Sequence, residues 1–225
     1  MSALPRLAVL VSGRGSNLQA ILEAIAASEL DAEIVGVFSD KPKAEALLKV
    51  ERRLRWSAKP TGFPDREAFD AALGDAVAAA KPDWVVCAGY MRILGDAFVR
   101  RFDGKLLNIH PSLLPKYKGL HTHRRALDAG DTEHGASVHF VIPELDAGAV
   151  IAQARIPVEP GDSPESLARR LLPREHALYA AVLRLAVAGR LAERNGAVFV
   201  DAQPLFTPLQ LDSAGNLSAP PTETR

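Results

Sequence analysis

The chain has 225 residues, enough for one large α/β domain with a sizeable core. Basic and acidic residues balance at 27 each, so the net charge of zero gives no indication of a nucleic-acid or membrane partner. Cys87 is the only cysteine, which excludes an intrachain disulfide and fits a cytoplasmic location, and no apolar run approaches the length of a membrane span.

The first half of the chain alternates strand and helix patterns. Apolar runs typical of buried parallel strands occur at 6–12, 33–40, 83–90 and 105–110. Helical patterns separate them at 18–28, 44–54 and 65–81, and Asn17 is placed to cap the first. This alternation predicts an α/β fold: an open, mostly parallel twisted sheet with helices on both faces and right-handed crossovers.

The second half predicts an antiparallel edge to that sheet. Two strand patterns, 135–144 and 149–159, are joined by the short turn 145–148. A helix then begins with Ser163 as its cap and Pro164 at its first position.

The end of the chain is less regular. Pro173 is expected to kink or break the last helix. The polar residues 208–225 predict a poorly ordered tail. We therefore expect a single domain over residues 1–207.

A glycine-rich segment, residues 13–17, joins the first strand to the first helix. Helix N-termini present N–H groups and a positive dipole end, and glycine lets the backbone approach an anion, so the segment predicts a phosphate site. The alternative is a tight turn with no ligand. Leu18 stands where a dinucleotide fingerprint has its third glycine, which weakens a nicotinamide site, although Asp40 could serve as the ribose-binding acid.

The strand pattern at 105–110 ends in a polar pair. Asn108 and His110 are two residues apart and so share one face of the strand. An amide can stabilise an oxyanion and an imidazole can carry a proton near neutral pH, which together suit acyl transfer. Asp146 lies on the turn between the two later strands and would meet His110 if that hairpin packs beside it.

A metal centre is the other use for histidines. His121 and His123 are two apart, but no set of residues has the spacing of a zinc site. We expect no catalytic metal and assign these two histidines to shaping the loop.

Several segments carry a resemblance to a known family. In chain order they are "VSGRGSNLQAI", "DREAFD", "AGYMRIL", "LLNIHPSLLPKYKGLHTHRRAL", "HGASVHFV", "ELDAGAVIAQ" and "EHALY". From about residue 7 to 200 the chain resembles the phosphoribosylglycinamide formyltransferases, folate-dependent enzymes of purine synthesis. The resemblance implies formyl transfer from the co-substrate 10-formyltetrahydrofolate to glycinamide ribonucleotide, without a metal, in a monomer or homodimer.

The same resemblance implies roles for individual residues. The catalytic set would be Asn108, His110 and Asp146. The ribonucleotide would be held by Gly15, Ser16, Asn17 and Glu175. The folate would be bound by Arg66, Met91, Arg92, Ile93, Leu94 and Asn108. Ser137 and His139 would support the site, and a cis peptide would precede Pro115.

The chain departs from the family pattern at one place. Leu172 and Pro173 stand just before Glu175, where the family often has polar residues, so the ribose contact is open.

Three other functions compete with this one. A formyltetrahydrofolate hydrolase shares the central motif, but usually carries a regulatory domain before it. A methionyl-tRNA formyltransferase would need a further domain and a basic surface. A non-catalytic nucleotide-binding module would keep the glycine segment alone, which the catalytic set argues against.

Overall fold

The computed structural model describes residues 3–219, which form two compact units. The first unit runs to Asn108 and includes Val141–Glu144. The second unit comprises Ile109–Phe140 and the residues from Leu145 onward. The single domain expected over residues 1–207 stays a prediction.

The first unit holds a parallel sheet, as the sequence predicted. Its strands are β1 (Arg6–Val11), β2 (Glu33–Ser39), β3 (Arg55–Ser57), β4 (Trp84–Cys87) and the first three residues of β5 (Leu106–His110), whose last two residues belong to the second unit. Their order is β5-β4-β1-β2-β3, and each neighbouring pair is parallel. β1 is buried along nearly its whole length, which explains its unbroken apolar sequence.

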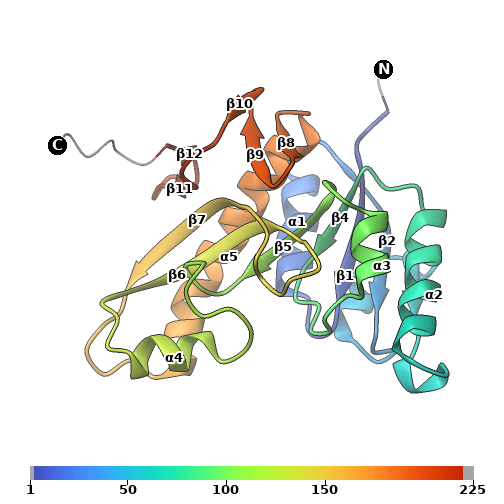
Figure 1. Cartoon of the computed structure of the whole chain (residues 1–225), viewed down its shortest axis with the longest axis horizontal. Helices are drawn as coiled ribbons and strands as arrows, with labels where there is room; N and C mark the ends of the chain where they lie inside the picture. Colours follow the sequence, from blue (N-terminus) through green and yellow to red (C-terminus); the bar gives the residue numbers. More distant parts are fainter. Residues whose placement is uncertain (1–2, 220–225) are drawn as a thin grey trace. The chain divides into compact units, whose positions relative to one another are not determined.

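Helices of the first unit cover this sheet. They are α1 (Ser16–Ala26), α2 (Arg66–Ala79) and α3 (Asp96–Arg101), with short 3₁₀ turns η1 (Glu45–Lys49), η2 (Arg52–Leu54) and η3 (Pro60–Gly62). α2 and α3 lie side by side (Figure 1). Buried side chains such as Phe69, Leu73 and Phe98 pack these helices against the strands. The rings of Trp56 and Phe63 extend this core around Phe69.

Two helix predictions in this unit were wrong. Asn17 does not cap α1, because the N-cap is Gly15 in a left-handed conformation and Asn17 already lies inside the helix. The pattern at 44–54 forms η1 and η2 and no α-helix. Val50 and Glu51, between these two turns, are extended, which interrupts the helical conformation there.

The second unit contains the predicted antiparallel pair. β6 (Glu133–Phe140) pairs with β7 (Val150–Pro157) in antiparallel register. The remaining elements are α4 (Thr122–Asp128), α5 (Pro164–Val187), β8 (Leu191–Arg194), β9 (Ala197–Val200), β10 (Gln203–Pro204), β11 (Leu209–Leu211) and β12 (Leu217–Ser218). α5 packs against both β6 and β7, and β8, β9 and β10 form a small antiparallel sheet (Figure 1).

The long helix α5 begins as predicted but is not broken. Ser163 caps it, with reciprocal side-chain bonds to Ser166, and Pro164 stands at its first position. Pro173 lies within the helix, which continues to Val187. Proline removes one backbone hydrogen bond. Buried residues on both sides of it, Leu171 and Leu178 among them, tie both halves of the helix to the same core.

The described part of the predicted tail, residues 208–219, contains two short strands, β11 and β12, and its order in solution stays a prediction. Leu209 and Gln210 pair with Ala152 and Gln153 of β7, so β11 adds a parallel strand to the second unit. β12 folds back on β11 as an antiparallel partner. Residues 220–225 of the predicted tail lie outside the described residues.

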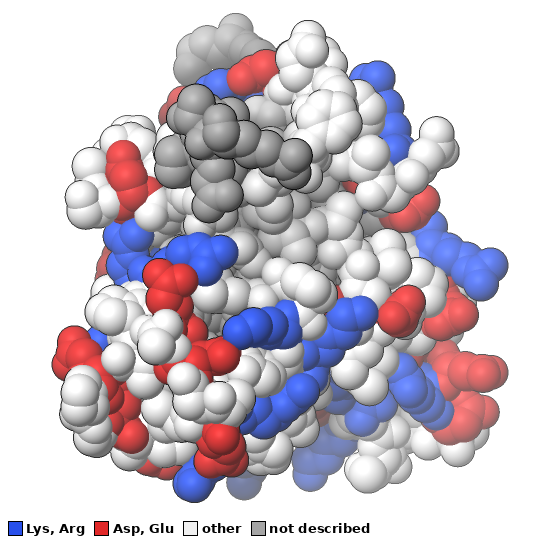
Figure 2. Space-filling model, turned by 60° about the vertical axis from the view of Figure 1, so that its left-hand side comes forward, with Lys and Arg blue, Asp and Glu red and all other residues white. Residues whose placement is uncertain are grey.

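Charges of both signs are spread over the surface that Figure 2 shows. This distribution agrees with the zero formal net charge of the whole sequence. No helix among the described residues is long and apolar enough to cross a membrane.

Candidate active site

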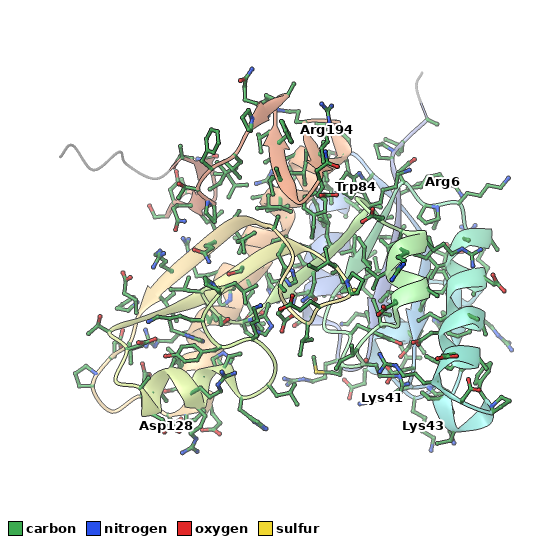
Figure 3. The ribbon with its side chains drawn as sticks, viewed as in Figure 1. Arg6, Lys41, Lys43, Trp84, Asp128 and Arg194 are labelled. Carbon is green, nitrogen blue, oxygen red and sulfur yellow. The ribbon has the colours of Figure 1, made fainter. Side chains whose placement is uncertain are left out.

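In the first unit, the candidate residues lie at the carboxyl ends of the parallel strands. Figure 3 shows Arg6 and Trp84, which begin β1 and β4, at one end of the sheet, and Lys41 and Lys43, which follow β2, at the other. Ligands of open α/β sheets bind at the carboxyl ends. The glycine segment follows the carboxyl end of β1.

The glycine segment has the backbone of an anion site. Gly15 adopts φ +74°, and a Cβ there would approach the Cβ of Ala46 to 2.5 Å, so only glycine fits without displacement. Ser16 and Asn17 are the first two residues of α1, where backbone N–H groups lack helical partners. The Oδ1 atom of Asn17 is buried and has no hydrogen-bond partner within residues 3–219.

Lys49 is a candidate that the sequence patterns did not single out. Its Cε lies 3.6 Å from the position of a Cβ on Gly15, and its Nζ donates a 3.1 Å hydrogen bond to Gln19. A cation beside the start of α1 adds to the attraction for an anion. Only the folding of η1 beside the loop reveals this lysine, which lies 34 residues from Gly15 in sequence.

The segment that follows β4 is held by polar contacts within the first unit. The Oγ of Ser12 donates to Asp40 at 2.6 Å and accepts from the backbone N–H of Met91 at 2.9 Å. Arg66 donates to the carbonyl oxygen of Ile93 at 2.6 Å. These bonds explain how Met91 and Ile93 keep exposed apolar side chains, 63% and 50% accessible, on a shaped loop.

Two further residues shape this loop. Asp70, a buried carboxylate that sequence reasoning missed, accepts the backbone N–H of Gly95 at 2.9 Å and lies 3.6 Å from Arg66. The guanidinium of Arg92 stacks on Phe69 at 5.1 Å. Arg66 on α2 therefore contacts the segment that carries the consecutive candidates Met91, Arg92, Ile93 and Leu94, and Leu94 is buried.

β5 carries the polar pair. Asn108 stands opposite Cys87 of β4, and His110 follows two residues later on the same face of the strand. His110 is 6% exposed. Cys87 is buried, which raises the pKa of its thiol to about 12 and removes it as a nucleophile.

His110 has an oxygen acceptor beside each ring nitrogen. Its Nδ1 lies 3.4 Å from Oδ2 of Asp146, and its Nε2 lies 2.9 Å from the backbone oxygen of Tyr117. A carbonyl oxygen can only accept, so Nε2 carries a proton and donates it. Asp146 is itself fixed, because Oδ2 accepts the N–H of Gly119 at 2.8 Å.

His139 is the second imidazole next to Asp146. Its Nδ1 donates to the carbonyl of Phe140 at 2.7 Å, and its Nε2 lies 3.7 Å from Oδ1 of Asp146. Burial lowers the pKa of His139 to about 4, so this ring is neutral at physiological pH. With its one proton on Nδ1, the neutral ring lies beside Asp146 and donates no hydrogen bond to it.

Ser137 supports the turn that follows β5. It accepts from the backbone of Leu114, donates to the carbonyl of Ser112 and accepts from Gln153, all at 2.7–3.0 Å. The peptide before Pro115 is cis, as expected.

Glu175 is a buried carboxylate on α5, only 9% exposed and two residues after Pro173.

No group of three or more histidine, cysteine, aspartate or glutamate side chains within residues 3–219 is arranged to hold a metal ion.

The geometry supports acid–base and oxyanion chemistry. Asn108 provides an amide, and His110 provides an imidazole whose two nitrogens face acceptors. In an imidazolium the Nε2 proton stays with the Tyr117 carbonyl, and the Nδ1 proton, on the nitrogen 3.4 Å from Asp146, could donate to a developing negative charge.

The comparisons with known proteins agree with this chemistry. Residues 5–183 match the family model described as "Formyl transferase". The chain is 47% identical over 199 residues to the phosphoribosylglycinamide formyltransferase of Escherichia coli, covering 88% of this chain and 94% of the relative.

Two solved structures extend the comparison. The phosphoribosylglycinamide formyltransferase of Coxiella burnetii is 45% identical with a TM-score of 0.84, covering 90% of this chain and 96% of that one. A formyltetrahydrofolate deformylase from Pseudomonas syringae is 28% identical with a TM-score of 0.79, covering 88% of this chain and 66% of that one. The chain therefore belongs to the formyl transferase family and, within it, to the phosphoribosylglycinamide formyltransferases.

Proposed function

We propose that this protein transfers a formyl group from 10-formyltetrahydrofolate to the amine of glycinamide ribonucleotide, a step of purine biosynthesis. Its family membership supports this activity. The observation that carries the chemistry is the buried imidazole of His110, placed between the carboxylate of Asp146 and the carbonyl of Tyr117.

The proposed reaction is a direct transfer. The amine nitrogen bonds to the formyl carbon, giving a tetrahedral oxyanion that the Asn108 amide and protonated His110 stabilise. The bond from the formyl carbon to N10 of the folate then breaks, and one proton passes from the amine to N10. Asp146 stabilises the imidazolium by its charge.

The ribonucleotide is assigned to the glycine segment and Glu175. Gly15, Ser16 and Asn17 would bind the phosphate through backbone N–H groups at the start of α1, and Lys49 adds a positive charge there. Glu175 would contact the ribose.

The folate is assigned to the loop after β4. Met91, Arg92, Ile93 and Leu94 would present backbone groups and apolar side chains to the flat pterin ring, and Arg66 holds that loop through Ile93. Ser137 would support the site by holding the backbone of Leu114, and His139 would support it by packing beside Asp146.

The remaining assignments concern the setting of the enzyme. We infer a cytoplasmic enzyme with small-molecule substrates and no nucleic-acid partner, working as a monomer or homodimer. The balanced charge supports the absence of a nucleic-acid partner.

One assay tests the function. The protein is mixed with glycinamide ribonucleotide and 10-formyltetrahydrofolate while folate absorbance and formylated ribonucleotide are both followed. We expect both signals to rise together, and only when the ribonucleotide is present. Silence in both signals would favour a non-catalytic nucleotide-binding module.

The same assay separates the second candidate function. The similarity to a formyltetrahydrofolate deformylase is a specific reason to consider hydrolysis. A hydrolase would release tetrahydrofolate and formate without the ribonucleotide, so the reaction lacking ribonucleotide is the control that decides between them.

A further inference from the structure

The carbonyl that accepts the Nε2 proton of His110 belongs to a residue in an unusual conformation. Tyr117 has φ +56°, in the left-handed region. For a residue other than glycine this conformation costs about 1–2 kcal/mol, so it persists only where the surroundings hold it. The position of the Tyr117 carbonyl therefore depends on whatever holds the rest of that residue.

The phenol of Tyr117 is what anchors it. Its Oη donates a 2.8 Å hydrogen bond to Oδ2 of Asp131, and the guanidinium of Arg125 stacks on its ring at 5.2 Å. The hydroxyl of Ser112 donates to the carbonyl of Lys116 at 2.6 Å, which fixes the peptide just before Tyr117. The residue is thus held from its backbone and from the far end of its side chain.

Asp131 is itself well placed to act as an anchor. It precedes β6, and its side chain is 17% exposed. The Nζ of Lys116 donates to both of its carboxylate oxygens, at 2.9 and 3.1 Å. A carboxylate that accepts from both an ammonium and a phenol stays ionised and oriented.

The position of the Tyr117 carbonyl determines which ring proton of His110 is free to donate. With the Nε2 proton held by the Tyr117 carbonyl, the second proton of an imidazolium lies on Nδ1, which faces Asp146. The 3.4 Å separation of Nδ1 from Asp146 is longer than a good hydrogen bond. The Nδ1 proton is therefore the one left for the oxygen of a formyl group.

We propose that Tyr117 and Asp131 are positioning residues for His110. Their phenol–carboxylate hydrogen bond holds the backbone oxygen that determines which imidazole nitrogen keeps its proton. This inference rests on the proposed function for its effect on turnover, but its effect on His110 exists without substrate.

The test compares Tyr117→Phe with Lys116→Gln. Tyr117→Phe removes the phenol bond and keeps the ring that stacks with Arg125. Lys116→Gln removes the other partner of Asp131 in the same segment but leaves the phenol bond. We expect Tyr117→Phe to lower kcat about fivefold, the loss that one hydrogen bond supports, with both KM values unchanged. Lys116→Gln should lower kcat by less than Tyr117→Phe does, because it removes one partner of Asp131 but leaves the phenol bond.

NMR spectroscopy of the ligand-free protein reports directly on the protonation of the two ring nitrogens of His110. In protein labelled with ¹⁵N-histidine, Tyr117→Phe should shift the Nε2 and Nδ1 signals of His110 toward each other. Such a shift is typical of an imidazole whose proton exchanges between its two nitrogens. Asp131→Ala should do the same, and Asp131→Asn, which still offers an oxygen to the phenol, should restore most of the wild-type signal. Adding Tyr117→Phe to Asp131→Ala should cause no further loss, because the two groups act through one bond.

The outcomes separate this inference from the proposed function. Wild-type kcat and unchanged His110 signals in Tyr117→Phe would overturn the positioning role even if the enzyme transfers formyl groups. The positioning role would also be overturned if Lys116→Gln lowered kcat as much as Tyr117→Phe does. A loss of kcat in Tyr117→Phe that is accompanied by a lower thermal midpoint would overturn it too, because these hydrogen bonds would then serve only the stability of the fold. An inactive wild-type protein with the expected His110 signals would instead remove the proposed function.

Discussion

At the scale of single residues, Asp146 has both an unusual backbone conformation and contacts with two histidines. It has φ +47°, accepts the N–H of Gly119 and lies near both His110 and His139. Asparagine also tolerates this left-handed conformation and can accept the same N–H. Asp146→Asn therefore removes the negative charge while it keeps the shape of the turn.

We expect Asp146→Asn to lower kcat by on the order of a hundredfold, the size of a typical contribution to proton transfer or oxyanion stabilisation. Steady-state rates at saturating substrates measure it. Asp128→Asn, at an exposed aspartate of α4, is the matched control and should leave kcat unchanged (Figure 3). Near-normal turnover in Asp146→Asn would remove the charge of Asp146 from the mechanism.

Gly15 offers a residue-scale test of the phosphate site. A side chain there would displace Ala46, whereas a Cβ on Gly13 would meet nothing within 4 Å. We expect Gly15→Val to weaken the binding of glycinamide ribonucleotide by about tenfold or more while the Kd for a folate analogue stays unchanged, because the altered backbone no longer presents its N–H groups. Titration calorimetry with each ligand measures this.

Gly13→Ala serves as the control within the same segment and should change neither affinity substantially. Equal weakening of both ligands by Gly15→Val would mean that the segment serves the fold and makes no selective contact with the ribonucleotide.

At the scale of elements, residues 211–215 are bound to α5 through arginines. Arg174 of α5 donates to the carbonyl oxygens of Leu211 and Asp212 at 2.8 and 2.9 Å. Arg184, further along α5, donates to the carbonyl of Gly215 at 3.3 Å. The pairing of β11 with β7 also covers backbone groups that would otherwise form an open edge.

Arg174→Met should therefore loosen the β11–β12 segment. We expect the thermal midpoint to fall by about 2–4 °C, corresponding to roughly 1 kcal/mol in a chain of this size. Hydrogen exchange at Leu209–Leu211 should become faster. Arg169→Met, at an exposed arginine of the same helix, is the control. An unchanged midpoint and unchanged exchange at β11 would show that these arginine bonds do not hold the tail.

At the scale of the whole molecule, buried histidines make stability depend on pH. Burial, and then the nearby His123, lower the pKa of His134 to about 4, while Asp131 acts in the opposite direction. In the unfolded chain the same group titrates near its ordinary value of 6.5. Between pH 6.5 and about 4, His134 therefore binds a proton in the unfolded state but not in the folded state.

This contribution to stability is therefore complete above pH 6.5 and is lost as the pH falls toward 4. His134→Gln should flatten the fall of the unfolding free energy in this range, by at most about 1.4 kcal/mol per pH unit. Urea unfolding from pH 7 to 4 measures the slope, with His121→Asn, at an exposed histidine, as the control. An unchanged slope in His134→Gln would show that His134 does not titrate differently in the two states.

Much of the fold followed from local patterns. The parallel strands of the first unit, the β6–β7 hairpin and the start of α5 at Ser163 and Pro164 were all predicted, because apolar periodicity and capping act over a few residues. The approach of Asp146 to His110 was anticipated from a motif and a turn, although the roles of these residues stay predictions.

The errors have a common origin in contacts between distant parts of the sequence. Pro173 reads as a helix breaker locally, yet packing on both sides keeps α5 continuous. The polar segment 208–219 also depends on distant contacts, because β7 supplies hydrogen-bond partners to it and α5 supplies arginines. Asn17 has the residue type of a cap, yet Gly15 is the N-cap, and the contact of Gly15 with Ala46 of η1 leaves no room for a side chain there.

The sequence by itself determined the order of the parallel strands along the chain, the family and the candidate acid–base residues. All of these are carried by side-chain type and spacing along a short stretch. Only the tertiary structure decided that the carbonyl of Tyr117 would accept the proton of His110 and that Asp131 would anchor Tyr117. That geometry depends on a left-handed backbone turn stabilised by a residue 14 positions away, and no local propensity encodes such a contact.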